Sequence, residues 1–394
     1  MVYFAVLLSI VLVLLVAERA LHGRSRRAIP NRIHVNGIRG KSSVTRLIAA
    51  GLRGGGIRTW AKVTGTEPNI IDVDGREIPI SRMNGASLSE QRTIFALAAH
   101  EQVNTLVIEC MAVQAKYQEV AEDAFVQSTI GVITNVRADH LEVYGDRFEG
   151  VAEALANTVP YRGVLFTTPG PGVEIFERIA RQRGSRVIAV PADEVPESAL
   201  DAFEYYEHRE NVAVALRVCA ELGVAREVAV AAMATARPDP GVLRVFEARF
   251  DARGASHILH VINALAANDP DSTLFLHQRL IAGRWDCPLF LFVNTRRDRP
   301  LRSIQLGQLL AKIPADRYFI AGNDVRSVLN AARDVGVEGS ALIDCAHQPP
   351  KAIVERVFAE VQGQAVLFAI GNTAAGGLQT IDEFATYEMK QGVA

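Results

Sequence analysis

The run RIHVNGIRGKSSVTRLI at residues 32–48 constrains the fold more than any other part of the chain. An apolar strand leads into a turn with two glycines, and a stretch of helical character follows directly. The glycines let backbone N–H groups point inward at phosphate oxygens, and the helix N-terminus adds partial positive charge there. The spacing is the short G-x-x-G-K-S, because Val35 stands where the longer motif has its first glycine. A helix cap at Ser42 after a tight turn is the plainer alternative.

We expect this loop to hold the phosphates of a nucleoside triphosphate. Lys41 would reach the β- and γ-phosphates, and the hydroxyl of Ser42 would bind Mg²⁺. The loop residues expected at the nucleotide are Gly37, Ile38, Arg39, Gly40, Lys41, Ser42 and Ser43.

Two further apolar strands end in polar side chains. The run LVIECM at residues 106–111 places Glu109 at a strand end, and GVITNVRADHLEVYG at residues 131–145 places Asn135, Asp139 and His140 at another. Since the carboxyl ends of parallel strands meet at one edge of a sheet, these groups should converge on the phosphate loop. Glu109 would hold Mg²⁺ directly or through water, and His140 would bind a metal or order the phosphates. Taken alone, Glu109 would more often be a solvated loop acid and His140 a structural hydrogen-bonding group.

Strands and helices alternate along most of the chain, which predicts an α/β fold. Continuous apolar strands separated by amphipathic helices are typical of a parallel sheet covered on both faces. Residues 235–241, with Pro238 and Pro240, interrupt the pattern and suggest a boundary. We therefore predict a phosphate-loop, parallel-sheet ATPase domain at residues 32–236 and a smaller Rossmann-like α/β domain at residues 237–394. The second domain should contain strands near residues 257–262, 288–293, 317–321, 341–344 and 365–370.

The first residues predict a membrane anchor. Residues 2–17, VYFAVLLSIVLVLLVA, contain no charge, and Arg19, Arg24, Arg26 and Arg27 follow them. Positive charge after the apolar run favours a single-pass transmembrane helix at residues 1–20 with the rest of the chain in the cytoplasm. Residues 21–31 would be a linker. A buried core helix is the alternative. The net charge of −2 provides no global basic field for nucleic acid.

Taken together, these motifs resemble the Mur ligase superfamily, which includes the folylpolyglutamate synthases. A closer resemblance than that to the superfamily is to the catalytic subunits of poly-γ-glutamate synthase of the capsule-B type. The resemblance covers nearly the whole chain. It rests on VNGIRGKSSVTRL, KVTGTEPNI, IECMAVQAKYQ, GVITNVRADHLEVYG, ENVAVALRVCAELG, ARPDPGVLRV, INALAANDPDST, NTRRDR and AIGNTAAGG.

The resemblance implies an ATP-dependent amide ligase that activates a carboxylate as an acyl phosphate and joins it to an amine. It implies Mg²⁺ near Ser42, Thr64, Thr66, Glu109 and His140, with nucleotide contacts also from Asn135 and, near the adenine, Asn211. The expected catalytic residues are Lys41, His140 and Arg297. The expected substrate residues are Arg39, Asn268, Asp269, Ser272, Thr273, Arg296, Arg297, Asp298 and Arg299. The plainer alternatives are an Asx turn with a helix cap at residues 268–273, a solvated charge run at residues 296–299, and a helix N-cap at Asn211.

Two departures from the superfamily bear on the substrate and on the metal site. The phosphate loop follows soon after the expected anchor, so the domain that grips a nucleotide-linked sugar is expected to be missing. Many members also use a modified lysine for a second Mg²⁺, but residues 141–162 contain no lysine.

The leading hypothesis is therefore extension of a γ-linked glutamate polymer at the cytoplasmic membrane face. The alternatives are a folylpolyglutamate-type ligase and an ATP-hydrolysing scaffold or energising subunit of an export complex. The expected partners are glutamate, the growing polymer, membrane lipid, a small polytopic membrane subunit and further copies of this chain. Nucleic acid is not an expected partner.

Overall fold

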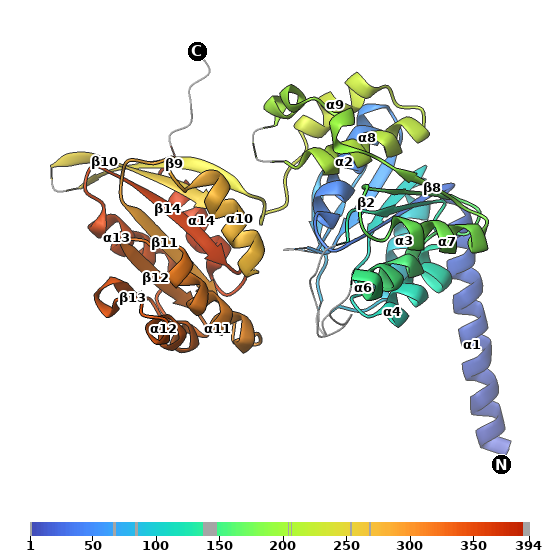
Figure 1. The fold of residues 1–394 in the computed structure, drawn as a ribbon. Coiled ribbons are helices and arrows are strands. Elements are labelled where there is room, and N and C mark those ends of the chain that lie inside the picture. The colour runs from blue at the N-terminus through green and yellow to red at the C-terminus, as the bar shows by residue number, and fades with distance from the viewer. Residues whose placement is uncertain are drawn as a thin grey trace. The chain divides into compact units, whose positions relative to one another are not determined.

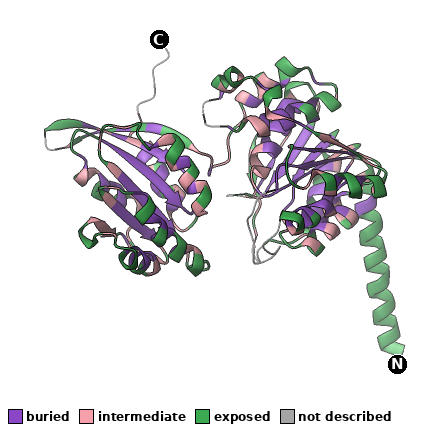
Figure 2. Ribbon diagram, in the orientation of Figure 1, coloured by how far each residue is buried: buried purple, intermediate pink, exposed green. Residues whose placement is uncertain are grey.

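The computed structural model describes residues 2–65, 68–82, 86–136, 148–203, 205, 207–252, 254–267 and 269–388. The chain divides into two compact units, Met1–Asp239 and Pro240–Ala394. Each unit has its own sheet and its own buried core, as Figures 1 and 2 show.

Eight strands form the sheet of the first unit within the described residues, in the order β4-β3-β2-β5-β1-β6-β7-β8. Strands β1 and β5 to β8 lie where apolar runs predict them, and they are parallel to their neighbours. The bounds are β1 (Asn31–Asn36), β2 (Thr59–Val63), β3 (Asn69–Ile71), β4 (Glu77–Pro79), β5 (Thr105–Glu109), β6 (Ile130–Ile133), β7 (Val164–Thr167) and β8 (Arg186–Ala189).

The expectation of a purely parallel sheet is wrong at one edge. Strand β3 pairs antiparallel with β2, and β4 pairs antiparallel with β3. The carboxylate of Asp72 accepts hydrogen bonds from the backbone N–H groups of Asp74 and Arg76 at 2.9 and 2.8 Å, which forms a short turn between β3 and β4. A connection this short permits only antiparallel pairing, because a parallel pair needs a crossover of a dozen or more residues.

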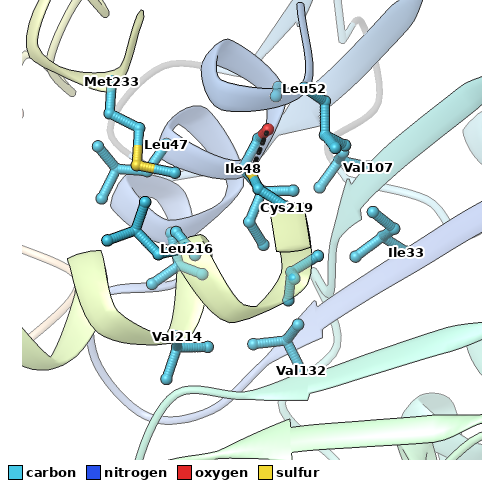
Figure 3. Close-up of a cluster of buried hydrophobic side chains, with 14 of the residues drawn as sticks. Ile33, Leu47, Ile48, Leu52, Val107, Val132, Val214, Leu216, Cys219 and Met233 are labelled. Atoms are coloured by element: carbon cyan, nitrogen blue, oxygen red, sulfur yellow. Dashed lines mark hydrogen bonds between the residues drawn. The ribbon is translucent and has the colours of Figure 1, made fainter. Parts of the chain in front are cut away.

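Helices cover both faces of this sheet. On one face α2 packs on the sheet through Leu47 and Ile48, α8 packs beside it, and α9 packs against α2. The thiol of Cys219 lies 3.8 Å from the carbonyl oxygen of Ile48 (Figure 3). On the other face Phe95 of α3 and Phe176 of α7 are buried. The helices are α1 (Val2–Arg27), α2 (Lys41–Gly54), α3 (Glu90–His100), α4 (Ala115–Val120), the π-helix η1 (Ala121–Val126), α6 (Phe148–Leu155), α7 (Val173–Arg183), α8 (Arg209–Glu221), α9 (Arg226–Ala234) and the short 3₁₀ helices η2 (Ala156–Thr158), η3 (Ala192–Glu194) and η4 (Glu197–Ala202).

Helix α1 extends further than the sequence predicts. It runs without a break to Arg27, so the expected linker at residues 21–31 is helical over its first seven residues. His22 and Gly23 are buried, and the ring of His22 meets Phe95 and Phe125 edge-on. This packing stabilises the last turns of the helix. The preceding apolar part is exposed along its length (Figure 2), with a mean hydropathy of 2.4.

The second unit contains six strands within its described residues, in the order β13-β12-β11-β14-β10-β9. All pairs are parallel except β9 with β10, so this sheet is also mixed. Strand β9 was not expected from the sequence, because the expected strands are continuous apolar runs and the residues of β9 alternate between exposed and buried. The strands are β9 (Arg244–Ala252), β10 (Ala255–Asn263), β11 (Leu289–Thr295), β12 (Arg317–Gly322), β13 (Leu342–Asp344) and β14 (Gln364–Gly371), with helices α10 (Pro270–Leu280), α11 (Pro300–Leu309), α12 (Val325–Asp334), α13 (Pro350–Glu360) and α14 (Gly377–Ala385) and 3₁₀ turns η5 (Leu310–Lys312) and η6 (Gly339–Ala341).

Candidate nucleotide site

The carboxyl ends of three neighbouring strands form the candidate site. Strand β1 lies between β5 and β6 and is parallel to both. The register places Val35 beside Glu109 and Asn36 beside Ile133. The phosphate loop after β1 therefore lies between Glu109 on one side and Asn135 on the other. The sequence argument predicts this convergence.

The loop backbone is held by the strand ends around it. Asn36 Oδ1 accepts a hydrogen bond from Gly37 N at 2.8 Å, and Asn135 Oδ1 accepts one from Arg39 N at 3.1 Å. The Arg39 carbonyl accepts from Thr134 Oγ1 at 2.6 Å and from Asn135 Nδ2 at 3.1 Å. Asn135 was expected to contact the nucleotide, but both ends of its amide bind the Arg39 backbone. Its observed contacts therefore shape the loop.

Two glycines are required by this geometry. Gly37 has φ 129° and Gly40 has φ 79°, a region that side-chain-bearing residues rarely adopt. A Cβ on Gly37 would overlap the side chain of Thr134. A Cβ on Gly40 would lie 2.7 Å from Asn211 Oδ1.

Lys41 is turned back onto its own loop. Its Nζ donates to the carbonyl oxygens of Gly37 at 2.8 Å and Ile38 at 3.3 Å. The ammonium group is thus hydrogen-bonded to neutral carbonyl oxygens. Charge-assisted hydrogen bonds to phosphate are stronger than bonds to neutral carbonyls. A triphosphate in the loop would therefore compete effectively for Lys41.

Glu109 is a buried carboxylate among hydrogen-bond donors. Its Oε2 accepts from Ser42 Oγ at 2.9 Å and from Thr64 N at 2.6 Å. Burial raises the pKa of Glu109, while the Lys41 charge and these two hydrogen bonds act in the opposite direction, and Asp239 raises it further. A buried carboxylate beside a hydroxyl provides the hard oxygen ligands that Mg²⁺ prefers.

The Mg²⁺ site predicted from the sequence can be checked only in part. Ser42 and Glu109 lie together, and Thr64 reaches Glu109 through its backbone N–H. Thr66 and His140 lie outside the described residues, as does Asp139. Among the residues that the structure does describe, no three His, Cys, Asp or Glu side chains form a metal cluster.

Asn211 and Glu207 approach the loop from the start of α8. Asn211 packs its amide against Gly40 and donates from Nδ2 to Glu207 Oε1 at 2.8 Å. The same oxygen accepts from His208 N at 2.8 Å, whereas Glu207 Oε2 is buried with no hydrogen-bond partner. Burial raises the pKa of Glu207 to about 7, against the lowering effect of these two hydrogen bonds.

Sequence reasoning missed Glu207 and Asp239. Glu207 stands four residues before Asn211, a helical spacing that could have signalled the pair. Asp239 lies in the Pro-rich run ARPDPG, and its Oδ2 would lie 3.0 Å from a Cβ on Gly65. No periodicity in the sequence indicates that this acid reaches the loop.

The second unit contains the other expected substrate residues. Asp269 caps α10 by accepting from Ser272 N at 2.8 Å. Thr273 is fully buried and donates from Oγ1 to the Ala267 and Asp269 carbonyls at 2.9 and 2.8 Å. These contacts match the helix-cap alternative. Asn268 lies outside the described residues.

The arginine run after β11 has a mixed environment. Arg296 forms a bidentate ion pair with Asp298 at 2.9 and 2.6 Å. Arg297 and Arg299 are exposed and make no side-chain hydrogen bond or ion pair with the described residues. Asn294, at the end of β11, is buried and donates from Nδ2 to the carbonyls of Asn372 and Ala374.

Comparison with known proteins defines the class. A family model described as the Mur ligase middle domain matches residues 35–216. Folylpolyglutamate synthase of Mycobacterium tuberculosis, complexed with ADP and AMPPCP, shares the fold with a TM-score of 0.68 and 18% identity over 93% of this chain and 94% of that one. MurF from Acinetobacter baumannii has a TM-score of 0.64 and 15% identity, covering 93% and 79%. The fold and the phosphate loop define an ATP-dependent ligase of the Mur ligase class.

More similar relatives define the family. A model described as the poly-gamma-glutamate synthase CapB C-terminal domain matches residues 250–387. PGA synthase CapB of Bacillus subtilis (strain 168) is 32% identical over 98% of this chain and 98% of its own length. Capsule biosynthesis protein CapB of Bacillus anthracis is 34% identical over 80% of this chain and 68% of its own length. The chain belongs to the CapB family of poly-γ-glutamate synthases.

Proposed function

We propose that this enzyme extends a γ-linked glutamate polymer by ATP-dependent amide formation at the cytoplasmic face of the membrane. The observation that carries the proposal is the meeting of Lys41, Ser42 and Glu109 at one sheet edge in a chain of this family. Phosphoryl transfer needs charge neutralisation and positioning more than covalent help from the protein. This sheet edge offers both.

The proposed reaction has two steps. A glutamate carboxylate attacks the γ-phosphorus of ATP, which forms an acyl phosphate and releases ADP. The amine of a second glutamyl group then attacks the acyl carbon, phosphate leaves with the bonding electron pair, and the nitrogen loses a proton to give the amide. Lys41 would leave its loop carbonyls and bind the transferring phosphoryl group.

Mg²⁺, held by Ser42, Glu109 and, from the family resemblance, Thr64, Thr66 and His140, would supply neutralisation of phosphate charge. We further propose that Asn211 contacts the adenine, and that Arg39, Arg297 and Arg299 bind substrate carboxylates. The exposed guanidinium groups of Arg297 and Arg299 suit this role, because a planar guanidinium binds a carboxylate in a bidentate manner. Asp269, Ser272 and Thr273 would act by shaping the start of α10.

The exposed apolar helix α1 supports a membrane setting for this reaction. A soluble pterin substrate would need no anchor, so a folylpolyglutamate-type activity is the weaker candidate. One apolar helix cannot form a conduit for a polyanion. We therefore also propose a small polytopic membrane subunit as partner, and association of further copies of this chain.

The test uses the full chain in membrane vesicles with ATP, Mg²⁺ and glutamate. We expect ADP to appear together with acid-stable polymer, and Lys41→Ala to reduce both by at least about 100-fold. Lys116→Ala is the matched control, because Lys116 is exposed and, within the part of the chain that the structure describes, its ion pair is with Glu119 one helical turn away. ADP release without any polymer would support the export-energising alternative. Full ATP consumption by Lys41→Ala would contradict the site.

A second variant separates substrate binding from nucleotide binding. Arg297→Ala should reduce amide formation about tenfold or more while the affinity for ATP stays within about twofold, since a lost bidentate contact costs roughly 1.5–3 kcal/mol. Arg326→Ala, a surface arginine of the same unit, is the control. Equal losses of ATP binding and amide formation would show that Arg297 has another role.

A further inference from the structure

Strand β1 carries two buried polar side chains on one face. His34 and Asn36 are two residues apart, so they point to the same side of the sheet, and both are almost wholly inaccessible to solvent. A central strand of a covered parallel sheet is normally apolar on both faces. Polar groups at these two positions therefore require specific partners.

Gln118 of α4 is the partner of Asn36. Asn36 Nδ2 donates to Gln118 Oε1 at 2.8 Å and to Thr158 Oγ1 at 3.1 Å. Gln118 Nε2 in turn donates to the Val113 carbonyl at 2.9 Å. With its amide fixed in this way, Asn36 presents Oδ1 to Gly37 N, the first N–H of the phosphate loop. A continuous chain of hydrogen bonds therefore links α4 to the loop.

Glu122 of η1 is the partner of His34. His34 Nδ1 lies 2.7 Å from Glu122 Oε2, and Glu122 Oε1 accepts from both Ser128 N and Ser128 Oγ at 2.7 Å. Glu122 follows Gln118 by four residues, which places both side chains on the side of the helix that faces β1. The π-helical geometry of η1 is rare and is often found near functional sites.

The C-terminal end of the same segment contacts the end of α1. His22 Nε2 lies 2.9 Å from the Phe125 carbonyl, and Arg26 Nη1 donates to the Ala124 carbonyl at 3.3 Å. Glu18 forms an ion pair with Arg92 of α3. The apolar helix thus continues into a foot, residues 18–26, that contacts Ala124 and Phe125 of η1 and also α3.

The geometry points to residues 115–126 as the element that positions the phosphate loop, with Gln118 and Glu122 as positioning residues and with α1 coupled to the loop through the same element. This inference rests on the proposed function, because it assumes that the loop binds ATP. A phosphate loop works through preorganised N–H groups, so a change in the orientation of Asn36 weakens every contact that depends on Gly37.

Two substitutions at position 118 test the positioning role. Gln118→Met keeps the side-chain volume but removes both hydrogen bonds, so we expect the KM for ATP to rise about tenfold with kcat within about twofold. Gln118→Glu can form both bonds only when its carboxyl is neutral. Its KM for ATP, relative to wild type at each pH, should lie near one at pH 6 and rise toward pH 8, because burial and Glu122 of η1 raise the pKa of a carboxyl placed there, against the opposing charge of His34 on β1.

The outcomes separate positioning from simple stabilisation. If Gln118→Met is less stable yet binds ATP with an unchanged KM, Gln118 is only structural and the inference is wrong. If Gln118→Met does not fold, Gln118→Glu at pH 6 and pH 8 makes the same comparison in one chain, and an unchanged KM ratio overturns the inference. Turnover by Lys41→Ala would instead contradict the proposed function itself.

A second set of variants tests the coupling to α1. The double change His22→Ala with Arg26→Ala removes the bonds to Phe125 and Ala124, and should raise the KM for ATP about threefold in membrane vesicles. Its effect should be less than additive with that of Gln118→Met, since both act through one element. Arg24→Ala is the control, because Arg24 is exposed on the same helix and its side chain makes no hydrogen bond or ion pair with the described residues. No change in the double variant, or full additivity, rejects the coupling.

Discussion

At the scale of one residue, the buried carboxylate of Glu109 lowers the stability of the fold in the ionised form that Mg²⁺ would bind. Its carboxylate is buried, and burial raises its pKa more than the charge of Lys41 and its hydrogen bonds lower it. Burial without a close partner raises the pKa, so the ionised form destabilises the fold. The same charge is what an incoming Mg²⁺ would need. Such costs are typical of binding sites that wait for a ligand.

We predict that Glu109→Gln is more stable than wild type and inactive. The amide keeps an acceptor for Ser42 and Thr64 and removes the buried charge, which should raise the melting temperature by roughly 2 °C. Because the folded-state pKa of Glu109 is raised, this difference should shrink as the pH falls and the native carboxyl becomes protonated. Thermal unfolding at pH 5 and pH 8 measures it, and a less stable Glu109→Gln would contradict the prediction.

Glu207 should make stability depend on pH. Its pKa rises from 4.5 in the unfolded chain to about 7 in the folded one. Between these values the native state binds a proton that the unfolded state has lost, so Glu207 stabilises the fold less as the pH rises. The advantage of Glu207→Gln over wild type should therefore grow from pH 4.5 to pH 7 by up to about 1.4 kcal/mol per unit, and stay level above.

Urea unfolding at four pH values between 5 and 8 checks this slope. Glu197→Gln is the control, since the side chain of Glu197 is 84% exposed. A stability difference for Glu207→Gln that is the same at all four values would show that Glu207 titrates normally.

The positions of single site residues can be predicted from the sequence only where one motif, or the order of parallel strands, brings them to the same place. Lys41 and Ser42 belong to one motif, and Glu109 ends the neighbouring strand, so their meeting follows from parallel topology. Asn135 lies at the predicted place, yet its contacts with the Arg39 backbone depend on the exact path of the loop. Glu207 lies just before α8, and although its spacing could signal a pair with Asn211, no local pattern indicates that the pair lies at Gly40.

At the scale of elements, apolar runs predict β1, β5 to β8 and β10 to β14, which include the edge strands β8 and β13. The buried strand β2 and the strands β3, β4 and β9 were not expected. Strands β3 and β4 have three residues each, too few for a periodic signal. The helical end of α1 could not be predicted either, because it depends on contacts with α3 and η1 rather than on its own residues.

Gly37 tests the junction between strand and helix. We predict that Gly37→Ala reduces ATP turnover at least about 100-fold and costs roughly 1–3 kcal/mol of stability, since a Cβ would overlap Thr134 at a φ that alanine avoids. Gly339→Ala is the matched control, because a Cβ there meets no atom within 4 Å and its φ is not positive. The rate of ATP turnover and the free energy of unfolding, measured on both variants, test this prediction. Near-normal turnover in Gly37→Ala would mean that the loop tolerates a different path.

At the scale of the whole molecule, α1 is the one helix of the described residues that is long and apolar enough to cross a membrane. None of its most apolar 18-residue window is buried in protein. Leaving this much apolar side-chain surface in water is unfavourable by about 25 cal/mol per Å², so the helix requires lipid or a protein partner. The proposed function places both units on the cytoplasmic side, the orientation that arginines after an apolar run favour.

We predict that a chain starting at Glu18 moves from the membrane fraction to the soluble fraction and keeps its fold. It retains Glu18, His22 and Arg26, so the foot of α1 still packs on residues 115–126 and ATP should bind with nearly unchanged affinity. A chain starting at Ile29 also lacks residues 18–28. It should bind ATP more weakly, although it is equally soluble. Fractionation, circular dichroism and ATP titration of the two chains separate anchoring from coupling. If the longer chain stays on the membrane, another surface binds lipid. If both chains bind ATP equally, α1 serves as an anchor alone.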